Sequence, residues 1–248
     1  SLAGLLVSMG DYEKALQFYT QAKDIREKTL GKKHSDLASS LNNLAGLHSK
    51  MGNYEKASPL FVQAKNIREK TLGKKHPLFA NALNNLAVLH NSMGNYDQEL
   101  LLLLQAKKIY EESPNKDYYL IASNLNNLAG SYLSLGNHKK ALPLFIEALN
   151  IREKTLGTEH PLFAASLTSL AGLYRNMRDY EKALPLFIQA KNILEKTPGK
   201  EHPNFANSLN HLGKIQGILG NHEAAFLYFI QAIQAMSSID ISSNISSS

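Results

Sequence analysis

Nine histidines are the side chains in this 248-residue sequence best suited to hold a metal ion or move a proton. Four of them recur at one position of a repeating pattern, and these are His34, His76, His160 and His202. Ligands one repeat apart lie on different rungs of a stacked repeat protein, so they cannot converge on one ion. We therefore expect these histidines to cap the helices that follow them, and we expect neither a metal site nor a cofactor.

Sequence signatures of catalysis are missing from the chain. There is no H-E-x-x-H, G-x-x-x-x-G-K-[ST], G-x-S-x-G or G-x-G-x-x-G pattern. The carboxylate pair Glu111-Glu112 has no histidine partner nearby in sequence, and without cysteine there is no thiolate nucleophile and no disulfide. We predict that this chain is not an enzyme and that it holds no catalytic residue.

Paired asparagines are the feature whose type and spacing indicate a function. The pairs are Asn42-Asn43, Asn84-Asn85 and Asn126-Asn127, and the same position then reads Thr168-Ser169 and Asn210-His211. Asparagine costs a helix roughly 0.5 kcal/mol relative to alanine, so its repetition needs a reason. A carboxamide both donates and accepts hydrogen bonds, which lets a row of them bind a peptide backbone of any sequence.

An exact period of 42 residues positions these pairs. Glycine recurs at Gly10, Gly52, Gly94, Gly136 and Gly220, with Arg178 in the one missing place. Each is followed by Asn or Asp, a good N-cap, so we expect the glycine to end one helix at positive φ and the next residue to cap another. Arg178 would then hold a strained conformation, which costs about 1 kcal/mol.

Each period contains two helical patterns. Leu83, Leu86 and Ala87 mark the first, and Ala57, Phe61, Ala64 and Ile67 mark the second. The sequence predicts an all-α repeat array over residues 1–236, with copies at about 1–34, 35–76, 77–118, 119–160, 161–202 and 203–236. Residues 237–248 are rich in serine, and we expect a flexible tail or linker there.

Composition excludes several classes of protein. Hydrophobic residues make up 44% of the chain, which is too many for a disordered protein, and the longest leucine run, Leu100–Leu104, is too short to cross a membrane. The net charge of +6 is low for a dedicated nucleic-acid binder, so nucleic acid is an unlikely partner on this ground. No signal peptide is visible, and the absence of cysteine fits a reducing compartment; we predict a cytoplasmic protein without membrane contact.

Three recurrent motifs carry a resemblance to a known family. They are Leu-Asn-Asn-Leu-Ala-x-Leu-(His/Tyr), Gly-Asn-Tyr-Glu-Lys-Ala and Arg-Glu-Lys-Thr-Leu-Gly-Lys-x-His-Pro. The chain resembles the 42-residue tetratricopeptide repeat (TPR) of kinesin light chains and of bacterial arrays, some of which are joined to caspase-like proteases of the CHAT type. The resemblance implies an α-solenoid, a right-handed TPR superhelix of six helix pairs.

The resemblance also implies where a peptide would bind. First helices of a TPR array line its concave groove, and the Asn after each core leucine would fall on it, as in the Asn ladder of kinesin light chains. The candidate groove residues are Asn42, Asn43, Asn81, Asn84, Asn85, Asn91, Asn126, Asn127, Arg175, Asn207 and Asn210. The alternative is that one Asn of each pair bridges neighbouring helices. A clamp for a C-terminal carboxylate is disfavoured, because only Arg175 and Lys214 are basic here.

The third copy and the chain ends depart from the pattern. Glu99 replaces a small alanine and Tyr110 replaces an arginine, which indicates either drift or a specialised contact. Ser1 aligns with Asn43 inside a first helix, so we expect a fragment. Two alternatives stay open for residues 237–248: they link the array to an additional domain of the parent chain, or they are the frayed end of the last helix. Two functions follow: a non-catalytic scaffold that binds a protein or peptide, or the sensor segment of a larger enzyme such as a CHAT protease.

Overall fold

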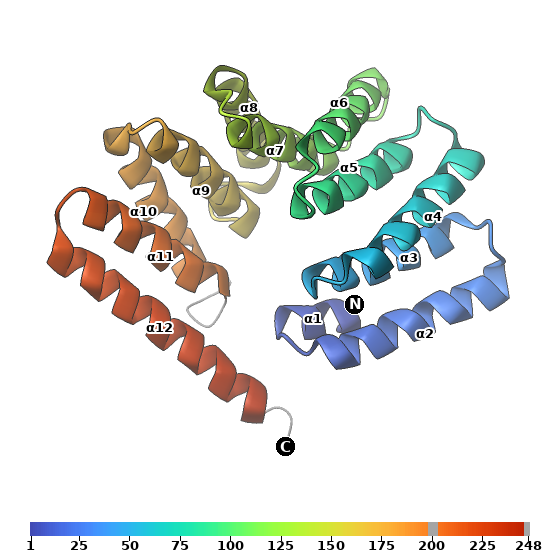
Figure 1. Ribbon diagram of the computed structural model, residues 1–248, viewed down its shortest axis with the longest axis horizontal. Helices are drawn as coiled ribbons and strands as arrows, with labels where there is room; N and C mark the ends of the chain where they lie inside the picture. The colour runs from blue at the N-terminus through green and yellow to red at the C-terminus, as the bar shows by residue number, and fades with distance from the viewer. Residues whose placement is uncertain (198–202, 246–248) are drawn as a thin grey trace. The chain divides into compact units, whose positions relative to one another are not determined.

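The structure is a computed structural model that describes residues 1–197 and 203–245. Within these residues it contains twelve α-helices and no strand, which confirms the all-α prediction of six helix pairs (Figure 1). The helices are α1 (Leu2–Ser8), α2 (Tyr12–Leu30), α3 (Ser35–Lys50), α4 (Tyr54–Leu72), α5 (Pro77–Ser92), α6 (Tyr96–Glu112), α7 (Tyr118–Ser134), α8 (His138–Leu156), α9 (Pro161–Asn176), α10 (Tyr180–Lys196), α11 (Pro203–Ile218) and α12 (His222–Ile245).

The turn within each copy has the expected backbone. Gly52 and Gly94 both have φ of +75°, and Arg178 has φ of +61°, the one positive value found for a residue other than glycine in the described chain. Asp11, Asn137 and Asp179 cap the next helix through their side chains. Asn53 and Asn95 occupy the same position without such a bond, so the N-cap prediction is wrong for the side chains of these two copies.

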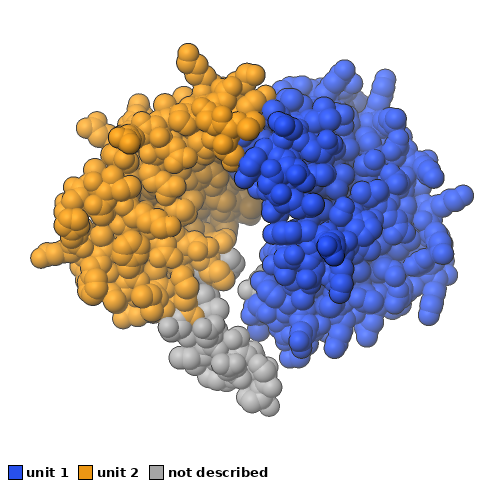
Figure 2. Space-filling model, viewed as in Figure 1, with its two compact units in different colours: residues 1–131 blue, residues 132–248 orange. Residues whose placement is uncertain are grey.

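The chain divides into two compact units, residues 1–131 (unit 1) and residues 132–248 (unit 2) (Figure 2). In unit 1, α3 packs on α4 and α5 on α6, and each second helix also contacts the first helix of the next copy. In unit 2, α9 packs on α10 and α11 on α12. Alanines fully buried between partner helices, such as Ala64 and Ala190, permit this close approach because their side chains are small.

Neither the internal prolines nor the C-terminal serines end the second helices in which they lie. Pro59, Pro143 and Pro185 lie inside α4, α8 and α10, and all three helices continue past them, as expected for a proline that only bends a helix. The last helix, α12, runs to Ile245 and so extends far into the serine-rich segment 237–248. None of the helices described is long and apolar enough to cross a membrane.

Candidate functional site

A groove of about 550 Å³ lies in unit 1 between the first helices of three successive copies. Its walls come from α1, α3 and α5, and side chains of α2 and α4 form its floor. The residues that line it are Gly4, Val7, Tyr19, Asn42, Asn43, Gly46, Leu47, Ser49, Lys50, Phe61, Asn85, Val88, Leu89 and Ser92. One of these side chains carries a formal charge, Lys50, so the groove is suited to an uncharged stretch of ligand.

Gly46, which is not among the groove residues predicted from the sequence, widens the groove at the middle of α3. A Cβ atom built on Gly46 would meet nothing within 4 Å, so packing within the protein does not require glycine here. Glycine inside a helix costs about 1 kcal/mol relative to alanine, and Gly130 and Gly172 repeat it at the same position. The recurrence of glycine inside a helix was the signal in the sequence, and the structure shows open space beside each of these three glycines.

The two asparagines of each pair have different surroundings. Asn42 and Asn84, the first members, are buried, whereas Asn43 is exposed and Asn85 is half-buried. Asn42 lines the groove, yet its Oδ1 is buried and has no hydrogen-bond partner among the described residues. An unpaired buried carbonyl oxygen is costly, and this oxygen is enclosed by the protein rather than open to the groove.

Asn84 bridges two copies instead of facing a ligand. Its Oδ1 accepts a hydrogen bond from Asn124 Nδ2 at 3.3 Å and another from Asn127 Nδ2 at 3.4 Å, which join α5 to α7. Asn124 Nδ2 also donates to the backbone oxygen of Leu103 at 3.2 Å. Asn126 is half-buried, and its Oδ1 has no partner in the part of the chain that is described. The alternative interpretation, a bridge between neighbouring helices, therefore applies to Asn84, and a binding role for the other pairs stays a prediction.

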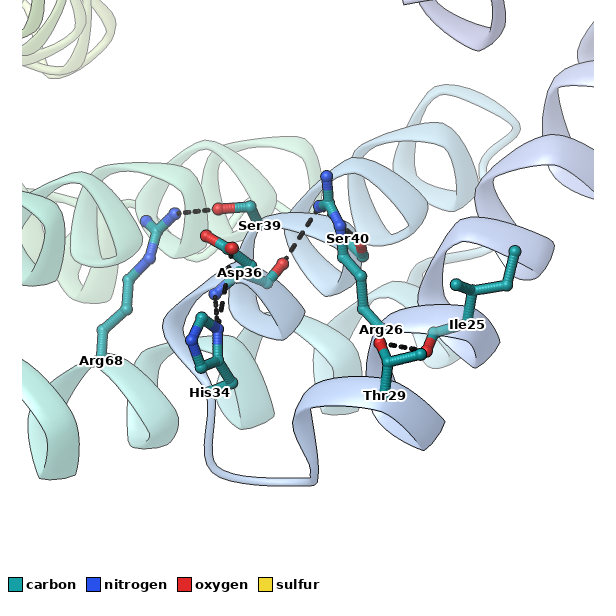
Figure 3. A network of polar contacts seen from close by, with 8 residues as sticks. All are labelled: Ile25, Arg26, Thr29, His34, Asp36, Ser39, Ser40 and Arg68. Atoms are coloured by element: carbon teal, nitrogen blue, oxygen red, sulfur yellow. Dashed lines mark hydrogen bonds and ion pairs between the residues drawn. The ribbon is translucent and has the colours of Figure 1, made fainter.

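Asn81 belongs to a polar junction between copies rather than to the open groove. Arg68, near the end of α4, is buried and donates from Nη1 to Asn81 Oδ1 at 2.9 Å and to the backbone oxygen of Leu78 at 3.0 Å. Figure 3 shows Arg68 reaching to Ser39 of α3, and the equivalent Arg26 bound in the same way to the start of α3. Burial lowers the pKa of the Arg68 guanidinium.

Asn91 forms a hydrogen bond with Glu99, the residue that replaces alanine in the third copy. Its Nδ2 donates to Glu99 Oε2 at 2.9 Å, which gives the buried carboxyl a partner. Burial raises the pKa of Glu99, and the hydrogen bond from Asn91 opposes that shift. This contact explains how an acidic side chain can be buried at a position where other copies have a fully buried alanine, as at Ala57 and Ala141.

The predicted site residues of unit 2 lie in a more basic setting. Arg175 and Asn210 are half-buried, and Asn207 is exposed. His211 stacks on Phe187 with ring centroids 5.2 Å apart, and burial lowers its pKa, with the positive charges of Arg175 and Lys214 adding to the effect. Two of the side chains in this region, Arg175 and Lys214, are positively charged, whereas the groove of unit 1 presents uncharged amides.

The loop histidines act as caps, as predicted. Nδ1 of His34, His76 and His160 each accepts a hydrogen bond of 3.1 Å from the backbone N–H two residues later. His202 lies outside the described residues. Over residues 1–197 and 203–245, no three His, Asp or Glu side chains are grouped closely enough to hold a metal ion.

Comparisons with known proteins agree with this architecture. The tetratricopeptide repeat family matches residues 1–70, 36–112, 120–175 and 162–238. The crystal structure of BtubC (BKLC) from P. vanneervenii is similar with a TM-score of 0.71 and 22% identity, over 95% of this chain and 92% of that one. That likeness concerns the fold alone.

Two further solved structures come from a kinesin light chain-like protein of Podosopora anserina with nearly identical TPR-like repeats. One has a TM-score of 0.58 and 27% identity, over 79% of this chain and 93% of that chain. Its Q17M variant has a TM-score of 0.60 and 28% identity, over 79% and 92%.

The search of curated proteins finds no match. None of these three structures is a caspase-like protease, so the joining of this chain to a CHAT domain stays a prediction. The family match, in contrast, spans most of the sequence and agrees with the helix pairs seen in both units. This chain belongs to the tetratricopeptide repeat family.

Proposed function

We propose that this chain is a non-catalytic scaffold that binds an extended or helical peptide segment of a partner protein in the groove of unit 1. TPR proteins generally mediate protein–protein contacts, and the groove is the place where this chain could do so. The observation that carries the proposal is the groove itself, in which the accessible carboxamides of Asn43 and Asn85 lie with Gly46, whose missing side chain leaves room for a ligand backbone.

Hydrogen bonds from amides would hold the peptide through its backbone. Asn43 and Asn85 line the groove with their carboxamides accessible, so they are the candidates for direct contact. Val7 and Val88 offer apolar contact to side chains of the ligand. Since a neutral hydrogen bond contributes about 0.5–1.5 kcal/mol net, several contacts must act together.

The experiment is to select binders from a random peptide library displayed on phage and to measure the best peptide by fluorescence polarisation. We expect Asn43→Ala with Asn85→Ala to weaken its binding roughly five- to 160-fold, which corresponds to the loss of two such bonds. Asn150→Ala, an exposed asparagine of α8 outside the groove, is the matched control and should leave binding unchanged. Salt should matter little because the contacts are uncharged.

Two results would overturn the proposal. One is a library that yields no binder; the other is a peptide whose affinity is equal for the folded double variant and the control.

We place the scaffold in the cytoplasm on the ground of its cysteine-free sequence. The same groove would serve as the sensor of a larger enzyme if the parent chain carries one.

A further inference from the structure

Another pocket of unit 1 lies between α4 and the loop that joins α2 to α3, and it has a volume of about 370 Å³. Three lysines line it, Lys32 and Lys33 from the loop and Lys70 from α4, whereas none of its described lining residues is an aspartate or a glutamate. We call it the lysine pocket. A pocket with three cations and no carboxylate attracts a negatively charged ligand.

Two of these three lysines have no acidic partner among the described residues. Lys32 Nζ lies 3.8 Å from Glu27 Oε1, so the charge of Lys32 is already matched. Lys33 and Lys70 are both exposed, and neither forms an ion pair with any residue that the structure describes. Like charges at one small pocket repel each other, so a carboxylate bound between them would be attracted by both.

The equivalent positions in later copies combine opposite charges. Each set joins a loop residue to a residue of the next second helix, and the sets in the sequence are Lys75 with Glu112, Asp117 with Lys154, and Glu159 with Lys196. In unit 2, Lys196 Nζ lies 3.7 Å from Glu159 Oε2, an ion pair that bridges two copies. Lys33 and Lys70 occupy these two positions in unit 1, so the carboxylate that pairs with the helix lysine in unit 2 is missing there.

We propose that the lysine pocket binds an acidic segment of a partner protein. An aspartate or glutamate of that segment takes the place that Glu159 holds in unit 2 and pairs with Lys33 and Lys70. Val62, which is 38% exposed, and Pro59 also line the pocket, so an aliphatic side chain next to the acid packs against them. Binding here is independent of the peptide groove, because the two sites share no lining residue.

The lysine pocket suits a protein segment better than a nucleic acid. Bases of a single strand stack on aromatic rings, and none of the described residues that line this pocket is aromatic. The amides of Gln63 and Asn66 also line it and are exposed, so they can bind a peptide backbone beside the acid. The pocket thus offers cations for the acid, amides for the backbone and apolar surface for a neighbouring side chain.

Selection from a random peptide library displayed on phage tests the proposal with the groove disabled. The target is the full chain carrying Asn43→Ala and Asn85→Ala, and peptides that also bind the same chain with Lys33→Glu and Lys70→Glu are discarded. We expect the selected peptides to carry an aspartate or glutamate beside an aliphatic residue. Fluorescence polarisation should show that their binding weakens at high salt, because exposed ion pairs are screened.

Substitution of the two lysines should weaken the binding of a selected peptide. Lys33→Ala with Lys70→Ala removes two exposed ion pairs, so we expect a loss of roughly two- to 30-fold in affinity. Lys33→Glu alone should weaken binding at least as much, because the new carboxylate can pair with Lys70 as Glu159 pairs with Lys196.

The matched control is Lys28→Ala with Lys75→Ala. These lysines hold the equivalent positions in neighbouring copies, are exposed and do not line the pocket, so the same loss of charge should leave binding unchanged. Far-UV circular dichroism checks the folding of each variant. Since Lys33 and Lys70 are also exposed, their substitution should not disturb the core.

Four outcomes would overturn the proposal. The library could yield no peptide that depends on the two lysines, or the selected peptides could lack acidic residues. Affinity could fall equally in the folded pocket variant and in the control. A uridine oligonucleotide could also displace the peptide and bind more tightly through the same two lysines, which would show that the pocket recognises phosphate.

Discussion

Two junctions between copies, α4–α5 in unit 1 and α10–α11 in unit 2, lie at equivalent positions of the repeat, but the first is polar and the second is apolar. In unit 1 a buried Arg68 satisfies Asn81 and the backbone oxygen of Leu78. In unit 2 the same position is Leu194, which joins an apolar cluster, and Ser208 donates to its own helix at Phe205. A repeat can therefore exchange a polar junction for an apolar one; the equivalent of Asn81 in unit 2, Asn207, is exposed and so does not need a buried donor.

The first helices of the two units differ in the same sense. Unit 1 presents asparagines whose amides bond across copies or line an open groove. In unit 2, Thr168 and Ser169 donate to backbone oxygens of their own helix, and the cations Arg175 and Lys214 lie near His211. Amides that stay available favour binding of a neutral backbone, so the peptide-binding role proposed above belongs to unit 1.

Breaking the polar junction should have the largest effect on stability. Arg68→Leu installs the residue of the apolar junction but leaves Asn81 and the Leu78 oxygen without their buried donor. We expect a loss of about 2–3 kcal/mol in the free energy of unfolding, measured by urea denaturation followed by circular dichroism. Arg26→Leu, at the equivalent but more exposed site, is the matched control and should cost less.

The double variant Arg68→Leu with Asn81→Ala sharpens the test. Removing the acceptor together with the donor leaves fewer unsatisfied groups, so part of the lost stability should return. A double variant as unstable as the sum of the two single changes would show that Arg68 acts through its packing and not through these bonds.

An intermediate effect is expected from the asparagine bridge. Asn84→Ala removes the acceptor shared by Asn124 and Asn127 and should destabilise unit 1 by about 1–2 kcal/mol, even though alanine favours helix. Thr168→Ala, the equivalent change in unit 2, breaks only a bond within one helix and should be nearly neutral or stabilising. Equal effects of the two changes on the thermal midpoint would contradict a bridging role for Asn84.

Much of this architecture could be predicted from the sequence because the period is exact. Position by position, the period identified the helix pairs, the capping histidines and the strained Arg178. It could not tell which Asn of a pair faces the groove, because this depends on neighbours one copy away. Asn84 is buried by Asn124, which varies independently of the pairs: the same position is Ser40, alanine, Ser166 or Ser208 elsewhere.

Relieving the strained turn of unit 2 should have the smallest effect and the opposite sign. Arg178 holds φ of +61° where Gly52 and Gly94 of unit 1 hold +75°, and its side chain is exposed. A side chain with a Cβ atom costs about 1 kcal/mol in this left-handed region, whereas glycine adopts it freely, although glycine also gives the unfolded chain more freedom. Arg178→Gly should therefore raise the thermal midpoint slightly, and the reverse change Gly94→Arg should lower it. If the first variant melts lower than the unaltered chain, the relief of backbone strain is smaller than the entropic cost of glycine together with any contact that the Arg178 side chain loses.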